Sequence, residues 1–414
     1  MKAIIHRGAR EIGGSCVELE CQGQRLVLDI GRPLDAALDD DVPLPPIAGL
    51  NGSDPSLLGV VISHGHPDHY ALVGGVDPTV PIYIGESTAR VLEEASFFSP
   101  VGASLQPRGF LTDRRSFSLG PFELTPYLVD HSAFDAYALL VEAGGRRMFY
   151  SGDLRAHGRK ASLFERLLAH PPSVHTLLLE GTRIDERGSG ERGALSERDV
   201  EEQALAVFRR APGAALAIYS PQNLDRLVTL YRATKRAERL FVLDLYAAAI
   251  TAASGRETIP QASWRDVRVF VPQRQRVRVK ETEEFERIAA VRSARLFPEQ
   301  LAALRDRLVI TFRSSMLAEL ERAECLAGAE ALWSMWPGYL ERPSGSALRD
   351  RLAEHGIPLA IAHASGHATV ADLERLVAAL RPERVVPIHT ATPERFSELF
   401  ACAELHADGE WWPV

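Results

Sequence analysis

Short apolar runs that lead into a titratable side chain recur along the chain. The runs are 59–62, 177–179, 359–362 and 385–388, and they lead into His64, Glu180, His363 and His389. Apolar runs of this length, bounded by polar clusters, are typical of buried strands. In layered α/β proteins, functional side chains gather where loops leave the strands. We therefore expect these four strand ends to carry the chemistry.

The middle of the chain follows a different pattern from its two ends. The opening is strand-rich, at 3–5, 17–20 and 25–28, and the charged stretch 185–197 is interpreted as a linker. Beyond it, helix-type segments alternate with strand-type segments, as in βαβ units. The helix-type segments are 201–210 and 225–234, and the strand-type segments are 214–219, 240–245 and 308–311.

The clustered histidines return only at His363, so we interpret the middle as an insertion in a domain built from both chain ends. The predicted divisions are 1–196 for the first part of that domain, 197–358 for the insertion and 359–414 for the return segment.

Composition and charge narrow the class of protein. Of 414 residues, 46% are hydrophobic and 25% charged, which suits a soluble globular chain of two or three domains. No apolar run approaches the ~18 residues of a membrane span, and the start lacks the apolar core of a signal peptide, so we expect a cytoplasmic protein. The net charge of −8 argues against nucleic-acid binding over the whole surface but leaves a local basic groove open.

The densest cluster of candidate ligands is His64-Gly65-His66-Pro67-Asp68-His69. Imidazole and carboxylate are the usual ligands of a metal such as zinc. The spacing, just past a strand, lets alternate side chains converge, so one turn can serve two metal ions. The alternative is a polar loop with surface histidines.

Three further candidates, His131, Asp153 and His389, each follow an apolar strand-type run. Alone, each would more often be a cap or turn residue. Their joint occurrence at strand ends favours one ligand set.

These motifs resemble the metallo-β-lactamase superfamily, and within it the β-CASP nucleases, most closely ribonuclease J. The superfamily motifs correspond to Asp29, to His64, His66, Asp68 and His69, to His131 and to Asp153. The β-CASP motifs correspond to Glu180, to His367 in His363-Ala364-Ser365-Gly366-His367, and to His389 in Pro387-Ile388-His389. The resemblance implies an α/β fold, with a metallo-β-lactamase αββα sandwich and an inserted α/β β-CASP domain.

The resemblance also implies roles in a two-metal centre. His64, His66 and His131 would bind one metal ion, and Asp68, His69 and His389 the other. Asp153 would bridge the two ions, and Asp29 would orient a ligand from behind. The metals would be two Zn²⁺, with Mn²⁺ an alternative because the ligand types do not separate the two.

For the reaction, the resemblance implies phosphodiester hydrolysis. Asp68 would orient or deprotonate the attacking water, and His367 would protonate the leaving oxygen while Glu180 holds its ring. His363 and Ser365 would donate to a phosphate oxygen.

The insertion should supply a wall for nucleic acid. Ser220, Asn223 and Arg226 open a helix whose N-terminus could bind phosphate, although simple N-capping is an equal alternative. Arg313 follows another strand and is a weaker candidate. Residues 274–280 alternate basic side chains, which predicts a strand with a basic face, either tracking a nucleic-acid backbone or protecting a solvated edge.

The substrate implied by His389 is RNA, because the DNA-acting branches carry an apolar residue there. We expect single-stranded RNA, with a 5′-monophosphate end as one option; exonuclease and endonuclease action both stay open. The alternatives are a hydrolase of small esters, a DNA-acting β-CASP nuclease and a non-catalytic scaffold.

The chain departs from ribonuclease J in two ways. It continues Pro387-Ile388-His389 with Thr390-Ala391, and we expect it to lack the extra C-terminal domain that is common in that group. The quaternary state, for which a homodimer is one expectation, therefore stays open.

Overall fold

The computed structural model describes residues 1–37, 40–100, 102–185 and 194–414. They form two compact units, one of residues 1–194 with 366–414 and one of residues 195–365. Most of the predicted linker, 186–193, lies outside the described residues. Among the described residues, no helix has the length and apolar character needed to cross a membrane.

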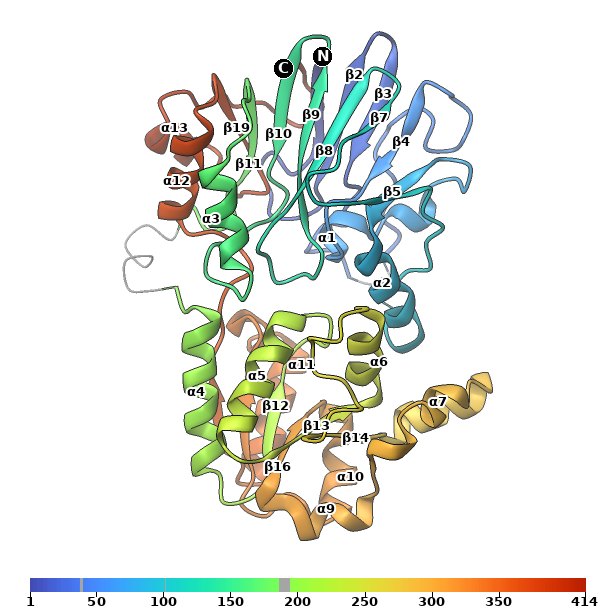
Figure 1. Ribbon diagram of the computed structural model, residues 1–414, viewed down its shortest axis with the longest axis vertical. Coiled ribbons are helices and arrows are strands. Elements are labelled where there is room, and N and C mark those ends of the chain that lie inside the picture. Colours follow the sequence, from blue (N-terminus) through green and yellow to red (C-terminus); the bar gives the residue numbers. More distant parts are fainter. Residues whose placement is uncertain (38–39, 101, 186–193) are drawn as a thin grey trace. The chain divides into compact units, whose positions relative to one another are not determined.

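The first unit is built on two sheets (Figure 1). In spatial order, the first sheet comprises β20 (Trp411–Pro413), β1 (Lys2–Arg7), β2 (Cys16–Cys21), β3 (Gln24–Leu28), β4 (Leu57–Val61), β5 (Ile82–Gly85) and β6 (Gly109–Leu111). The second comprises β19 (Arg384–Ile388), β11 (Thr176–Glu180), β10 (Arg146–Tyr150), β9 (Tyr137–Ala143), β8 (Phe122–Leu128) and β7 (Phe117–Leu119). Both sheets mix parallel and antiparallel pairs.

The two sheets pack face to face around one apolar core. Leu19 of the first sheet and Leu139 and Val141 of the second belong to it. Leu140, between them, faces the opposite way and packs in a separate cluster with side chains of α3 (Ala161–Ala169) and α12 (Val370–Leu380). Because both faces of β9 are covered, its sequence is nearly continuously apolar.

Helices cover the outer faces and complete four layers. On the first sheet, Leu92 of α2 (Glu86–Phe98) packs against Val60 and Ile62. On the second, α13 (Glu394–Leu399) joins α3 and α12 through Phe396. The predicted αββα sandwich is confirmed. Pro387 is tolerated in β19 because that strand is the edge of its sheet.

The second unit has one parallel sheet with helices. Its strands, in spatial order, are β15 (Arg295–Leu296), β14 (Val267–Phe270), β13 (Leu240–Asp244), β16 (Leu308–Thr311), β12 (Ala215–Ile218), β17 (Glu330–Trp333) and β18 (Leu359–Ile361). Its helices are α4 (Glu197–Arg210), α5 (Leu224–Arg236), α6 (Leu245–Ala253), α7 (Gln273–Thr282), α8 (Glu286–Ala289), α9 (Pro298–Leu304), α10 (Leu317–Arg322) and α11 (Pro343–Glu354). The predicted α/β fold class of the insertion is confirmed.

The second domain boundary differs from the prediction. We placed 359–361 in the return segment, but this strand pairs in parallel with β17, so the second unit runs to Ser365. An apolar run alone does not say which sheet a strand joins.

The predicted basic strand at 274–280 is wrong, because these residues form helix α7. Gln275 and Val279, one helical turn apart, are the buried positions, and Arg276 pairs with Glu319 at 2.5 Å. Figure 1 shows α7 extending away from the rest of its unit. The alternation of basic residues therefore reflects helical exposure and forms no basic strip along one strand face.

Arg226 forms a buried charge pair in the second unit. Its guanidinium meets the Glu197 carboxylate at 2.9 and 3.1 Å and also donates to the Ala364 carbonyl at 3.1 Å. Both charged side chains are buried. Arg226 is thus not available to substrate, and the prediction that it binds phosphate is corrected: it joins α5 to α4 and holds the segment that carries His363 and Ser365.

Replacing Arg226 by Met should lower the free energy of unfolding of the second unit by about 3–5 kcal/mol, because Glu197 is left buried without its partner. Arg232→Ala is the matched control on the same helix. The Arg232 side chain is exposed and Glu201 keeps its pair with Arg236, so the loss should be less than about 1 kcal/mol. Urea denaturation measures both. Equal, small losses would contradict a structural role for the Arg226 pair.

Candidate metal centre

The turn after β4 carries four candidate ligands in two local conformations. His66 is extended and precedes the short helix α1 (Pro67–Tyr70), where Pro67 occupies the first turn and fixes the helical backbone angle. His66 therefore lies on extended chain, and Asp68 and His69 on helix. His64 and His66 contribute to one group of potential ligand atoms, and Asp68 and His69 to another.

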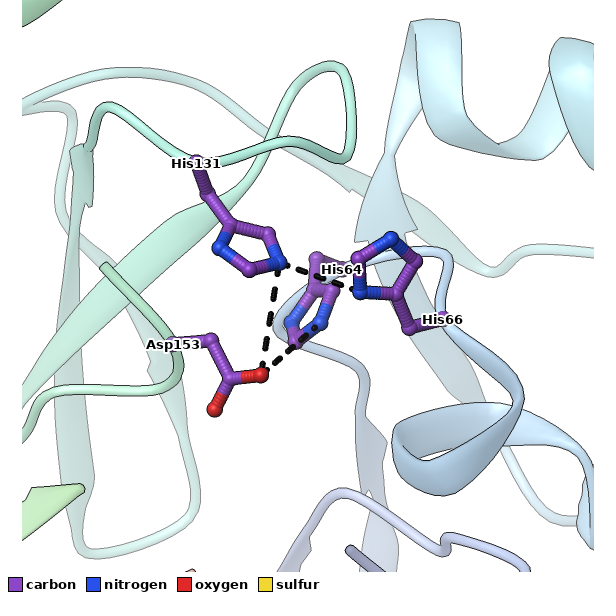
Figure 2. Close-up of side chains that lie close together, drawn as sticks. All are labelled: His64, His66, His131 and Asp153. Carbon is purple, nitrogen blue, oxygen red and sulfur yellow. Dashed lines mark hydrogen bonds and ion pairs between the residues drawn. The ribbon is translucent and has the colours of Figure 1, made fainter. Parts of the chain in front are cut away.

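The first group of potential ligand atoms comes from His64, His66, His131 and Asp153, all within 4.8 Å of one another. Figure 2 shows the three rings and the carboxylate converging on one point. Asp153 Oδ2 lies 3.6 Å from His64 Nε2 and 4.0 Å from His131 Nε2. His66 Nδ1 lies 3.0 Å from His131 Nε2.

A second group comes from Asp68, His69 and His389. His389 Nε2 is 3.2 Å from Asp68 Oδ2, and His69 Nε2 is 3.3 Å from Asp153 Oδ2. Asp153 also lies 3.8 Å from His389. The same carboxylate therefore faces both groups, which are the groups that the family resemblance implies.

The ring nitrogens of His69 and His131 that point away from the centre each donate a hydrogen bond. His69 Nδ1 donates to Asp29 Oδ2 at 2.7 Å, and His131 Nδ1 donates to the Gly366 carbonyl at 2.6 Å. A proton on Nδ1 leaves the Nε2 lone pair facing the centre, as a metal ligand requires. A Cβ atom at Gly366 would lie 2.5 Å from Ser132 Oγ and 3.1 Å from His131 Cε1, which explains why glycine suits the position.

Asp29 accepts several of the hydrogen bonds behind the centre. Besides His69, its carboxylate accepts from Ser63 N at 2.6 Å, Ser63 Oγ at 2.7 Å and the Tyr150 hydroxyl at 2.7 Å. The motif match pointed to Asp29. Ser63 and Tyr150 were missed, because a serine and a tyrosine at strand ends carry no distinctive sequence signal.

Thr182 was also missed, although it stands in the Glu180-Gly181-Thr182 motif. Its hydroxyl lies 2.8 Å from His389 Nδ1 and 3.1 Å from His367 Nδ1. Thr182 therefore supports two rings, that of His389 in the second ligand group and that of His367.

The donor set fits metal ions. Among the described residues, Nε2 of His64, Nε2 of His69 and both carboxylate oxygens of Asp153 are buried without a hydrogen bond. The 3.3 Å approach of His69 Nε2 to Asp153 is within ion-pair distance but lacks hydrogen-bond geometry. Leaving a buried carboxylate unsatisfied is costly, and a bound cation removes that cost.

The protonation states of His64, His66, His131 and Asp153 suit the same purpose. Burial lowers the pKa of His64 and His131 well below the usual value, and that of His66 to about 4. Burial alone would raise the pKa of Asp153, but the charges of His389, His69 and His367 hold it well below its usual range. Neutral imidazoles and an ionised carboxylate are the forms that bind metal. For His69, in contrast, the carboxylates of Asp153 and Asp29 outweigh burial and raise the pKa well above its usual value.

His367 differs from the other rings. Its Nδ1 lies 3.2 and 3.3 Å from the two Glu180 oxygens and 3.7 Å from Asp153 Oδ2. Burial opposes its charge, but the carboxylates of Glu180 and Asp153 outweigh burial and raise the pKa of His367 to about 9. It therefore carries a proton at neutral pH and is suited to donate one. Its atoms also form a third potential ligand group, with Asp153, Glu180 and His389.

Comparison with known families agrees with this geometry. Residues 34–219 match the beta-lactamase superfamily domain, and residues 359–400 match the Zn-dependent metallo-hydrolase RNA specificity domain. The chain belongs to the metallo-β-lactamase superfamily. The predicted superfamily is confirmed.

Curated relatives of this chain are distant ribonucleases J. That of Mycobacterium tuberculosis H37Rv is 25% identical over 410 residues, covering 92% of this chain and 67% of the relative. That of Sinorhizobium meliloti is 23% identical over 374 residues, covering 84% and 60%. A solved Enterococcus faecalis protein of unknown function has the same fold over 99% of both chains, with a TM-score of 0.81 and 21% identity.

The substrate contacts predicted from the sequence lie in the second unit. Ser220 is exposed, and Asn223 caps α5 by accepting from Arg226 N at 2.9 Å, so capping accounts for Asn223. Arg313 is bound to Asp244 at 2.5 and 3.3 Å and lies over the Tyr246 ring. His363 and Ser365 are half-buried at the carboxyl end of the unit.

Metal analysis of the purified protein should find two ions per chain, as in two-metal hydrolases. Asp153→Ala should lose metal from both groups, whereas His389→Ala should lose it mainly from the second. His355→Ala, a surface histidine paired with Glu321, is the control and should keep both ions. Elemental analysis after gel filtration measures the content. Full metal content in Asp153→Ala would refute the shared ligand.

Proposed function

We propose that this metallo-hydrolase is a ribonuclease that hydrolyses phosphodiester bonds of single-stranded RNA. The observation that carries the proposal is the pair of ligand groups around Asp153, with a protonated His367 beside them. The match of residues 359–400 to an RNA specificity domain supports RNA as the substrate class.

His64, His66, His131, Asp68, His69, His389 and Asp153 would hold two zinc ions, with manganese as the alternative. Bound metal ions would supply a water of lowered pKa and would stabilise charge on the phosphoryl oxygens.

Asp68 would orient the attacking water or take its proton. Although burial would raise its pKa, the hydrogen bond from His389 and the charge of His69 lower the pKa of Asp68 to about 2. These contacts keep the Asp68 carboxylate ionised, the form that accepts a hydrogen bond from a water. Its fixed position, 3.2 Å from His389 Nε2, suits an orienting role.

His367 donates the proton that the leaving oxygen requires. Its Nδ1 is held by Glu180, whose carboxylate is itself held by Leu154 N and Thr182 N at 3.2 Å each. The carboxylate fixes the ring and stabilises its charge until the proton is transferred. Glu180 is therefore a positioning residue, and His367 the acid.

Phosphate oxygens of the RNA would be bound by His363, Ser365 and Ser220. Arg226 holds this region through Ala364, and Arg313 contributes its charge mainly to Asp244. A 5′-monophosphate end is one ligand that such donors would suit, and both exonuclease and endonuclease action are compatible with them. A homodimer stays a prediction.

The protein should cleave single-stranded RNA in preference to the matching DNA. A chelator should stop the reaction because it removes the metal ions. Asp68→Ala should stop it because it removes the carboxylate that faces the water. A gel assay with 5′-monophosphate and 5′-hydroxyl substrates measures cleavage and separates trimming from internal cutting. Cleavage of a chromogenic ester but of no nucleic acid, with both metals bound, would favour a small-ester hydrolase.

His367→Ala should lower kcat about 10²–10⁴-fold, the usual contribution of a general acid, while the metal content stays unchanged. Single-turnover cleavage and elemental analysis of the same preparation test both points, with His355→Ala as the matched histidine control. Loss of metal in His367→Ala would make this residue a ligand and refute its role as the acid.

A further inference from the structure

An exposed aromatic patch follows strand β17 in the second unit. We define the patch as Trp336, Tyr339 and Arg342. Trp336 is 54% exposed and Tyr339 41% exposed. Large aromatic side chains usually bury most of their surface, so two adjacent exposed rings suggest a binding surface.

The rings of the patch are held in place. The Trp336 and Tyr339 rings meet edge to face, with centroids 5.4 Å apart and planes at 89°, and the Arg342 guanidinium lies 4.9 Å from the Tyr339 centroid. The Trp336 carbonyl accepts from Trp333 Nε1 at 3.4 Å. A methyl group added at Gly338 would overlap the six-membered ring of Trp336, so that ring lies directly over the glycine. Surfaces ordered in advance lose less entropy on binding.

Strand register places the patch beside the candidate phosphate contacts. Trp333 of β17 pairs in parallel with Ile218 on one side and with Ile361 on the other. Parallel strands leave the sheet at one edge, so the chain segments beyond these three residues are neighbours. Those segments carry Ser220, the patch and His363.

A direct contact ties two of these segments together. Ser334 Oγ, two residues before Trp336, donates to the Ala362 carbonyl at 2.7 Å, next to His363. Residues 359–400, which match the RNA specificity domain, begin with the strand that pairs with β17.

We propose that the aromatic patch is a stacking site for nucleobases of single-stranded RNA. This inference rests on the proposed function and adds a subsite to it. Indole, phenol and guanidinium planes all stack on bases, and stacking tolerates any sequence because every base has a π-face. His363, Ser365 and Ser220 would bind the backbone, while the patch binds the bases. A second copy of this chain is the competing occupant.

Binding of labelled single-stranded RNA, measured by fluorescence anisotropy in the His367→Ala background, tests the proposal. Trp336→Ala should weaken binding about tenfold or more, as the loss of a stacked base does. Tyr339→Phe should keep the affinity because it keeps the ring. Gly338→Ala should weaken binding by displacing the Trp336 ring, although every side chain of the patch remains.

Trp411→Ala is the matched control, a tryptophan of similar exposure (42%) on the other unit, and it should bind like the background. An oligomer of abasic ribose phosphates should bind Trp336→Ala and the background equally. Unchanged RNA affinity in both Trp336→Ala and Gly338→Ala, in folded protein, would overturn the stacking site and leave the nuclease proposal standing. A shift from dimer to monomer with unchanged RNA affinity would assign the patch to a second copy. Failure of the background to bind any RNA would overturn both proposals.

Discussion

The burial of one carboxylate, that of Asp153, is the constraint on which the centre depends. Both of its oxygens are buried without a hydrogen bond among the described residues, yet five histidine rings surround it at 3.3 to 4.0 Å. A buried negative charge that no N–H group satisfies requires cations. The fold surrounds the carboxylate with atoms that can bind a metal ion and not with hydrogen-bond donors. The site is therefore suited to binding metal.

Support for the ligands comes from groups that do not face the centre. Asp29, Thr182 and the Gly366 carbonyl each hold the outward nitrogen of a ring. The contacts to Asp29 and to the Gly366 carbonyl select the tautomer, and all three contacts limit rotation of the ring, so the ligand geometry exists before any ion binds. The same arrangement separates the roles of the histidines. Burial keeps His64, His66 and His131 neutral, whereas the carboxylate of Glu180 keeps His367 charged.

The second unit combines a rigid interior with polar and aromatic strand ends. The buried charge pair of Arg226 and Glu197 joins α4 to α5, and the same guanidinium holds the segment before Ser365. The patch of Trp336, Tyr339 and Arg342 leaves the same sheet edge as His363. On these neighbouring segments, polar donors would bind the backbone of a single strand and aromatic rings would stack on its bases.

The sequence by itself determined the superfamily, the fold class and the identity of the residues that the structure gathers around Asp153. It could do so because those residues stand in short motifs at the ends of apolar runs, and both signals are local. Tertiary structure decided what depends on distant partners. Residues 274–280 alternate like a strand but form a helix because Gln275 and Val279 are the positions that pack. Arg226, predicted to bind phosphate, is instead paired with Glu197. Leu359–Ile361 belongs to the sheet of the second unit because it pairs with β17. Ser63, Tyr150 and Thr182 entered the site only through contacts made by the folded chain, since hydrogen bonds across the sheets leave no periodic trace in the sequence.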